Sequence, residues 1–237
     1  MHPLGELLLG VAFSYAAYQR FKNVVSSQKN GDETTPPDTG GSRLSGIRRD
    51  RALSRVVTTD RHGDRLTGTT YEVKDINERV NYIRGMIKKY RYHPQTWELA
   101  AKIVGKRCGD TWCAPEKDND AEINAVFKWF RAHVRYARDP FQRDTFQAPH
   151  RTAEAGRGDC DDYAIGMGAV LQNLGYPVKL RVIQTRTSED WNHIYLLVGL
   201  PPQNPSQWVP LDGSMPQPAG WEAPSDIVKR RRDFDID

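Results

Sequence analysis

The chain has 237 residues, of which 38% are hydrophobic and 27% are charged, and its formal net charge is +4. A chain of this length can bury one good core with extensions, but it is too short for two large domains. Its 3 cysteines are too few for a framework of disulfides, and they leave the redox compartment open. Composition therefore excludes a disulfide-rich scaffold and indicates one main domain.

The first residues differ from those that follow. Apolar side chains, Leu4 and Leu8 among them, cover most of a predicted helix over residues 4–18. The stretch carries Glu6, lacks the basic start of a signal peptide, and is shorter than the ~20 residues of a membrane span. We expect residues 1–25 to form a helix that docks in another subunit; a marginal membrane anchor is the second interpretation, and a helix packed on its own domain is the third.

Residues 26–50 are rich in Ser, Gly, Pro and Thr, which predicts a flexible linker, and residues 51–237 are expected to form one domain. Basic residues concentrate between positions 43 and 107 and again in Lys229–Arg232. These segments can contact nucleic acid, but no aromatic residues alternate with them as in a recognised binding module. We interpret them as solvated surface.

Three helices are predicted before the middle of the chain. Asp75 begins a capping-box pattern, and its helix is expected to end before Pro94. Thr96 can cap a second helix, and Asp118 or Asp120 can cap a third. We interpret these helices as a layer on one face of a small antiparallel sheet, an α+β fold.

Cys160 stands where a glycine turn opens into another helix, with Asp159 as the predicted N-cap. A helix N-terminus and a nearby imidazole both lower the pKa of a thiol, so this is a suitable place for a nucleophile. The neighbouring carboxylates of Asp159, Asp161 and Asp162 would raise that pKa unless they point elsewhere.

The helix is expected to end at Gly175. Strand-like stretches follow it at residues 178–183, 193–198 and 207–211. His193 opens the second stretch and Asp212 follows the third, so neighbouring antiparallel strands would place the carboxylate beside the imidazole. Cysteine, histidine and aspartate in this order are a nucleophile, its base and the group that orients the base. Each residue alone has an ordinary structural explanation, and only the ordered set predicts a site.

Residues 121–214 resemble the transglutaminase-like superfamily of papain-related cysteine enzymes, through Gly158–Asp162 and the Leu-Gly-Tyr-Pro segment that follows. The resemblance implies a papain-like core at about residues 118–214, with Cys160 as nucleophile, His193 as base and Asp212 as orienting acid. Residues 123–149 also resemble family members encoded among virion genes of tailed bacteriophages. This resemblance implies a location in the virion, or in the host bacterial cytoplasm during assembly, with other virion subunits as partners.

The predicted function is a cysteine hydrolase or acyltransferase that cleaves an amide bond of a protein or peptide substrate without a cofactor. Attack by Cys160 gives a thioester, which water or an amine resolves. The Cys160 backbone N–H would bind the oxyanion, and Gln147 and Trp191 are candidates for the second donor. The alternative is a catalytically silent structural or adaptor subunit of a virion, associated with its tail, neck or capsid.

The cysteines leave two further questions. Cys160, His193 and Asp212 could instead be three ligands of a zinc ion, but paired-ligand spacing is absent, so no metal site is predicted. Cys108 and Cys113 can form a small disulfide loop or remain two reduced thiols. Their pairing would leave Cys160 free.

Overall fold

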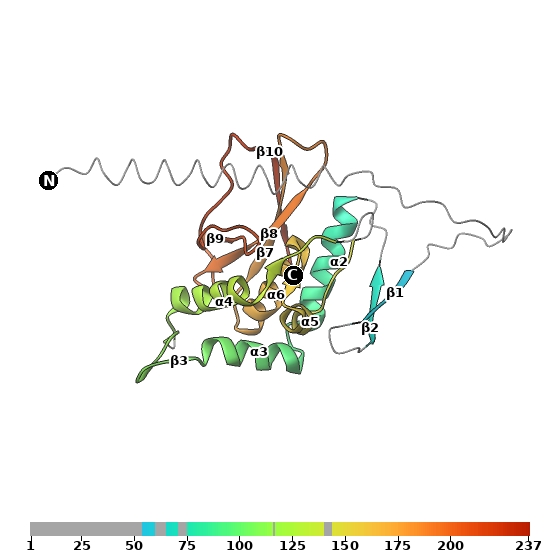
Figure 1. Ribbon diagram of the computed structural model, residues 1–237. Coiled ribbons are helices and arrows are strands. Elements are labelled where there is room, and N and C mark those ends of the chain that lie inside the picture. Colours follow the sequence, from blue (N-terminus) through green and yellow to red (C-terminus); the bar gives the residue numbers. More distant parts are fainter. Residues whose placement is uncertain (1–53, 60–64, 71–74, 116, 140–143) are drawn as a thin grey trace.

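The computed structural model describes residues 54–59, 65–70, 75–115, 117–139 and 144–237 (Figure 1). The predicted docking helix and linker, residues 1–25 and 26–50, lie outside the described residues. Within the described part of the chain, no helix combines the length and apolar character needed to cross a membrane.

The described elements follow a mixed order of helices and strands. They are β1 (Ser54–Thr59), β2 (Arg65–Thr70), α2 (Ile76–Tyr90), α3 (Pro94–Val104), β3 (Arg107–Cys108), β4 (Thr111–Trp112), α4 (Asn119–His133), β5 (Arg135–Tyr136), α5 (Pro149–Ala155), β6 (Arg157–Gly158), α6 (Cys160–Asn173), β7 (Val178–Thr185), β8 (His193–Leu200), β9 (Gln207–Leu211) and β10 (Val228–Asp235).

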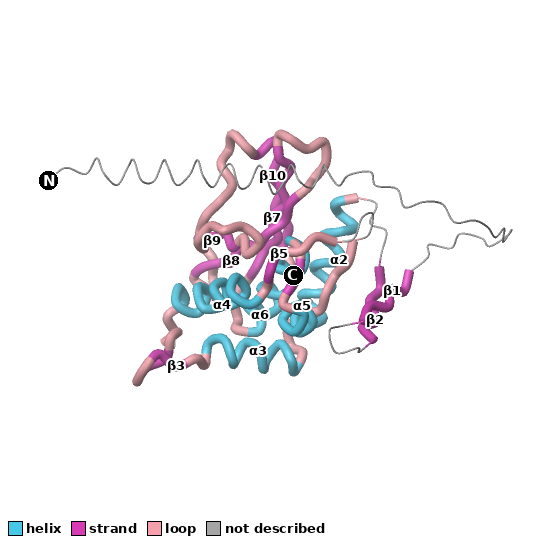
Figure 2. The backbone as a smooth tube through the Cα atoms, viewed as in Figure 1, coloured by secondary structure: helices cyan, strands magenta, loops and turns pink. Residues whose placement is uncertain are grey.

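The main sheet is antiparallel, with strand order β10-β7-β8-β9. One face, which includes Leu180 and Leu196, packs against the helices, and the other, which includes Ile183 and Leu197, packs under the chain between β9 and β10. Figure 2 shows this sheet meeting a layer of helices. Because both faces are covered, β7 and β8 are buried along most of their length. The predicted α+β arrangement and the three predicted strands are confirmed.

The central helix is α6, in which every residue from Cys160 to Gln172 is buried. It packs against α2, α3, α4, α5 and β8. Glycines permit these close approaches: a Cβ on Gly166 would lie 2.5 Å from Cε1 of Phe130. The helix starts with the predicted Asp159 cap and stops at Leu174, one residue before Gly175, whose φ of 92° suits glycine.

The caps of the earlier helices agree with the sequence at two of three positions. Asp75 accepts hydrogen bonds from two N–H groups at the start of α2, and Asp118 accepts one from Ala121 at the start of α4. The prediction for Thr96 is wrong, because α3 begins at Pro94 and Thr96 is buried within its first turn. Proline at the first helical position has a suitable φ and no N–H to satisfy, so it starts the helix earlier.

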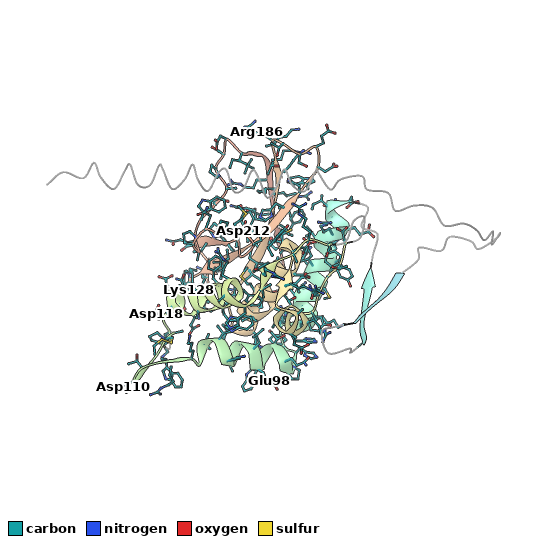
Figure 3. All side chains as sticks on the ribbon, in the orientation of Figure 1. Glu98, Asp110, Asp118, Lys128, Arg186 and Asp212 are labelled. Carbon is teal, nitrogen blue, oxygen red and sulfur yellow. A yellow bond between two sulfur atoms is a disulfide. The ribbon has the colours of Figure 1, made fainter. Side chains whose placement is uncertain are left out.

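Cys108 and Cys113 form a disulfide across the exposed β3–β4 hairpin, and Cys160 is the free cysteine of the chain. Figure 3 shows Asp110, in the turn of this hairpin, far from Asp212 near the middle of the molecule. The disulfide therefore lies away from the predicted catalytic residues.

The basic run Lys229–Arg232 belongs to β10, which is an edge strand of the main sheet among the described residues. These four residues are exposed, as expected of solvated surface, but they form regular strand rather than a tail. Several charges here are paired within the sheet; Arg181 of β7, for example, binds Asp233 at 2.6 Å.

Candidate active site

The turn before Cys160 is held by the end of α4. The β5 and β6 segments pair in parallel, and the N–H groups of Arg135 and Ala137 donate to the carbonyls of Gly156 and Gly158, each at 2.9 Å. Gly158 has no room for a side chain, because a Cβ there would lie 2.6 Å from Cβ of Asp162. This packing fixes Cys160 as the first residue of α6, where its thiol meets the positive end of the helix.

His193 and Asp212 lie side by side, as expected of neighbouring antiparallel strands. His193 begins β8, Asp212 directly follows β9, and His193 Nε2 lies 2.6 Å from Asp212 Oδ2. The other Asp212 oxygen accepts hydrogen bonds from the backbone N–H and the hydroxyl of Ser214, at 3.2 and 2.7 Å. Asp212 thus favours a neutral imidazole with the proton on Nε2, which leaves Nδ1 able to accept another proton.

The buried Asp212 carboxylate also decides the net pKa shift of His193. Burial by itself lowers the imidazole pKa, but the charge and hydrogen bond of Asp212, together with the charge of Asp161, raise it by more in sum, so the net shift is upward. The pair therefore favours the imidazolium that forms when His193 takes a proton.

Cys160 and His193 both line one small pocket near the first turn of α2. The remaining lining residues are Ile76, Arg79, Val182, Trp191 and Ile194. The pocket volume is about 10 Å³, which is close to the smallest space that holds one water molecule. The structure thus brings the three predicted residues together, Cys160 and His193 through the pocket and Asp212 through its hydrogen bond.

The carboxylates around Cys160 have separate partners. Asp159 accepts the N–H groups of Asp161 and Asp162 as the helix cap, and Asp162 accepts from Gln147. Asp161 points toward the thiol: Cys160 Sγ donates to its Oδ1 at 3.7 Å. The expected rise of the thiol pKa is therefore found for Asp161, and the charge of Asp159 adds to it.

The surroundings of Cys160 keep its thiol protonated in this conformation. Burial raises the thiol pKa well above its ordinary value, and the carboxylates of Asp161 and Asp159 raise it further. Arg79 and a hydrogen bond from the Ile194 N–H lower it. The thiol thus needs a base, such as His193, to become a nucleophile.

The two oxyanion candidates lie in different positions. The side-chain amide of Gln147 donates to Asp162 at 2.6 Å and to the Arg157 carbonyl at 3.2 Å, so here it supports the turn before Cys160. Trp191 lines the pocket with Cys160 and His193, and the guanidinium of Arg230 lies 5.1 Å from its ring centroid. Trp191 is therefore the candidate that already faces the thiol pocket.

Arg79 is the charged residue of the pocket lining, and the sequence did not reveal it. It comes from the first turn of α2, and its guanidinium lies between Asp144, before α5, and Asp161, at the start of α6. No local pattern distinguishes this arginine from the many others in the basic segment, because its meeting with Asp161 depends on tertiary packing.

A metal ion is not indicated by the arrangement. Among the described residues, no group of three or more His, Cys, Asp or Glu is placed to hold one.

The family model of the transglutaminase-like superfamily matches residues 106–213, which include Cys160, His193 and Asp212. We call the matched part of the chain the transglutaminase-like core. Its ends fall before β3 and just after Asp212, so α2, α3 and β10 lie outside the matched residues.

Two solved structures are similar to this chain. LapG of Legionella pneumophila, EGTA-treated, shares 20% identity, covers 63% of this chain and 78% of its own, and has a TM-score of 0.41. A protein of Cytophaga hutchinsonii described as a candidate cysteine protease shares 13% identity, covers 78% and 73%, and has a TM-score of 0.39. No curated protein matches the sequence.

Proposed function

We propose that the protein is a cysteine hydrolase or acyltransferase that cleaves an amide bond in a protein or peptide through Cys160, His193 and Asp212. One observation carries the proposal: the free Cys160 shares a pocket with His193, whose Nε2 is held by Asp212 at 2.6 Å. This is the arrangement of a nucleophile, a base and an orienting acid.

In the proposed reaction, Cys160 Sγ attacks the carbonyl carbon while His193 Nδ1 takes the thiol proton. The C–N bond then breaks, the amine leaves with the proton from His193, and a thioester remains. Water or a second amine attacks the thioester, His193 takes its proton, and the thiol is restored as the acid or the new amide departs. Asp212 stabilises the imidazolium in both halves.

The developing oxyanion would be bound by the Cys160 backbone N–H at the start of α6. Asp159 leaves this N–H free, because its carboxylate caps the N–H groups of Asp161 and Asp162. We propose Trp191 as the second donor, since it already lines the pocket, whereas Gln147 would first have to release Asp162.

The second candidate function is a structural or adaptor subunit that keeps the fold without catalysis. The raised thiol pKa and the pocket of about 10 Å³ favour it, because a peptide cannot reach Cys160 without displacing the pocket lining. The active form of the first proposal therefore requires part of the pocket lining to move when substrate binds.

A thiol-directed peptide amide probe separates the two functions. The other two cysteines form a disulfide, so Cys160 is the available thiol. If the protein is an enzyme, the peptide probe should label Cys160 selectively. A small alkylating reagent without the peptide should reach the same labelling rate only at a much higher concentration. Cys160→Ala is the control and should take no label. Equal reactivity toward both reagents would instead support the silent module.

We also propose that the protein acts within a tailed-phage particle, on the resemblance of residues 123–149 to virion proteins. In this proposal, residues 1–25 dock in another virion subunit and residues 26–50 tether the enzyme. Mass spectrometry of purified particles tests the location, since the chain should be present at a fixed ratio to the other subunits.

A further inference from the structure

The wall of the Cys160 pocket is completed by a helix from outside the transglutaminase-like core. Ile76 and Arg79, in the first turn of α2, line the pocket with Cys160 and His193. The match to the family model begins only at residue 106, well after α2. The environment of the thiol is therefore set partly by a segment that the core does not contain.

Asp161 is the carboxylate that bears most directly on the thiol. Its side chain is 1% exposed, one oxygen accepts from Cys160 Sγ at 3.7 Å, and the other lies 3.5 Å from Nη1 of Arg79. Burial raises the pKa of Asp161 to about 6, although Arg79 opposes this shift. A buried negative charge at this position disfavours a second negative charge on the adjacent sulfur.

Arg79 is held in a fixed place between the loop before α5 and the start of α6. Its Nη2 binds Asp144 while its Nη1 faces Asp161, and its side chain is 28% exposed. Burial lowers the Arg79 pKa, but Asp161, Asp144 and the thiolate form of Cys160 raise it, so the guanidinium stays charged. The acidic groups that act on this cluster are Asp144 and Asp139 from the loop before α5 and Asp159 from the turn before α6.

We propose that Arg79 is a positioning residue of the active site, which fixes the buried Asp161 carboxylate and offsets its charge so that Cys160 can form a thiolate. This inference rests on the proposed function, in which Cys160 is the nucleophile. Arg79 touches Asp161 rather than the reacting carbonyl, so it acts through the electrostatics of the thiol. The pair also ties α2 to the start of α6, which links α2 to thiol reactivity.

The thiol pKa of the full chain tests the proposal directly. Isotope labelling of cysteine Cβ allows Cys160 to be titrated by NMR, and the disulfide cysteines do not titrate. The method needs no substrate and no reagent access to the pocket. Arg79→Gln should raise the titration midpoint by about one pH unit, which lowers the thiolate fraction at neutral pH about tenfold. Arg79→Lys, which keeps the charge but loses the forked contact, should fall between Arg79→Gln and the wild type.

Two further variants distinguish electrostatics from a structural effect. Asp161→Asn should lower the midpoint, because the Arg79 cation then faces the thiol without a neighbouring carboxylate. A purely structural role of the ion pair would move both variants in the same direction. Lys88→Gln is the matched control, since it removes a positive charge from the same helix. In the wild type, Lys88 pairs with Asp237 at 3.9 Å, away from the pocket. Its midpoint should equal that of the wild type.

An unchanged midpoint in folded Arg79→Gln would overturn the proposal. If Arg79→Gln does not fold, then Arg79→Lys and Asp161→Asn decide, and shifts of the same sign would also overturn it. These results are distinct from failure of the proposed function. That function fails when the peptide probe shows no preference for Cys160, whatever the midpoint of the titration.

Discussion

Cys160 combines a position that favours reaction with surroundings that hold its proton. The start of α6 stabilises a thiolate, whereas burial and the carboxylates of Asp161 and Asp159 oppose it by raising the thiol pKa. Burial is the largest of the influences that raise the thiol pKa. His193 offsets it in function, because a base in the same pocket can accept the proton as the sulfur attacks.

The orientation of His193 should depend on Asp212. Asp212→Asn can present an N–H to Nε2 and so favour the tautomer that carries its proton on Nδ1, which then cannot accept the thiol proton. We expect labelling of Cys160 by the peptide amide probe to slow by about a hundredfold or more. Ser214→Ala is the control: it removes a 2.7 Å hydrogen bond to Asp212 but keeps the carboxylate at the imidazole. Wild-type rates in Asp212→Asn would contradict the assigned role.

The carboxyl of Asp161 should make stability depend on pH. Its pKa in the folded chain is about 6, above the ordinary value of 3.8, so the folded state binds the proton more tightly than the unfolded state. Its stabilising contribution is therefore full below 3.8 and is lost as the pH rises through about 6. Asp161→Asn removes this loss.

Denaturant unfolding at several pH values measures the effect. The free energy of unfolding of Asp161→Asn minus that of the wild type should increase from about pH 4 to about pH 7, by a few kcal/mol at most. Subtraction removes the contribution of other carboxylates that titrate alike in both proteins. A difference that stays constant, or that decreases, would show that the folded pKa of Asp161 is not raised.

At the scale of elements, α6 determines both the core and the position of the nucleophile. Gly166→Ala should destabilise the protein by about 1–3 kcal/mol, because the new Cβ would lie 2.5 Å from the buried ring of Phe130. Gly85→Ala in α2 is the matched control, since nothing lies within 4 Å of its Cβ position. That exposed helical site should gain about 0.5–1 kcal/mol. Denaturant unfolding should therefore give opposite signs for the two substitutions.

The sequence predicted elements wherever a local chemical signal defines them. Aspartates at positions 75, 118 and 159 cap α2, α4 and α6, and strand-like stretches mark β7 to β9. The neighbouring strands also led to the pair of His193 and Asp212. Each of these signals lies within a few residues of the feature that it defines.

The elements that were missed lack such a signal. Helix α5 has 7 residues, too few for a periodic apolar stripe, so the sequence does not predict it. Strand β10 consists mostly of exposed charged residues, so only its pairing with β7 makes it a strand. The contact of Arg79 with Asp161 joins α2 to α6 across the fold, and no single stretch of sequence contains that information.

At the scale of the whole molecule, one hydrophobic core runs through the described residues from Val80 to Ile236. We therefore expect a chain that lacks residues 1–25 to fold and to keep the thermal stability of the full chain. It should also keep the labelling rate of Cys160 but lose incorporation into the particle, if the docking helix acts as proposed. Co-purification of the truncated protein at full occupancy would contradict the docking role, and a large loss of thermal stability would show that this segment packs on its own domain.

The exposed strand β10 has a consequence for self-association. The outer edge of a sheet presents unpaired N–H and C=O groups, which another molecule can extend into a continuous sheet. Among the described residues β10 is an edge strand that carries four consecutive cationic side chains, Lys229–Arg232, so a register that places these runs opposite each other brings like charges together. We therefore expect the run that could contact nucleic acid to disfavour this pairing and to keep the sheets of neighbouring copies apart.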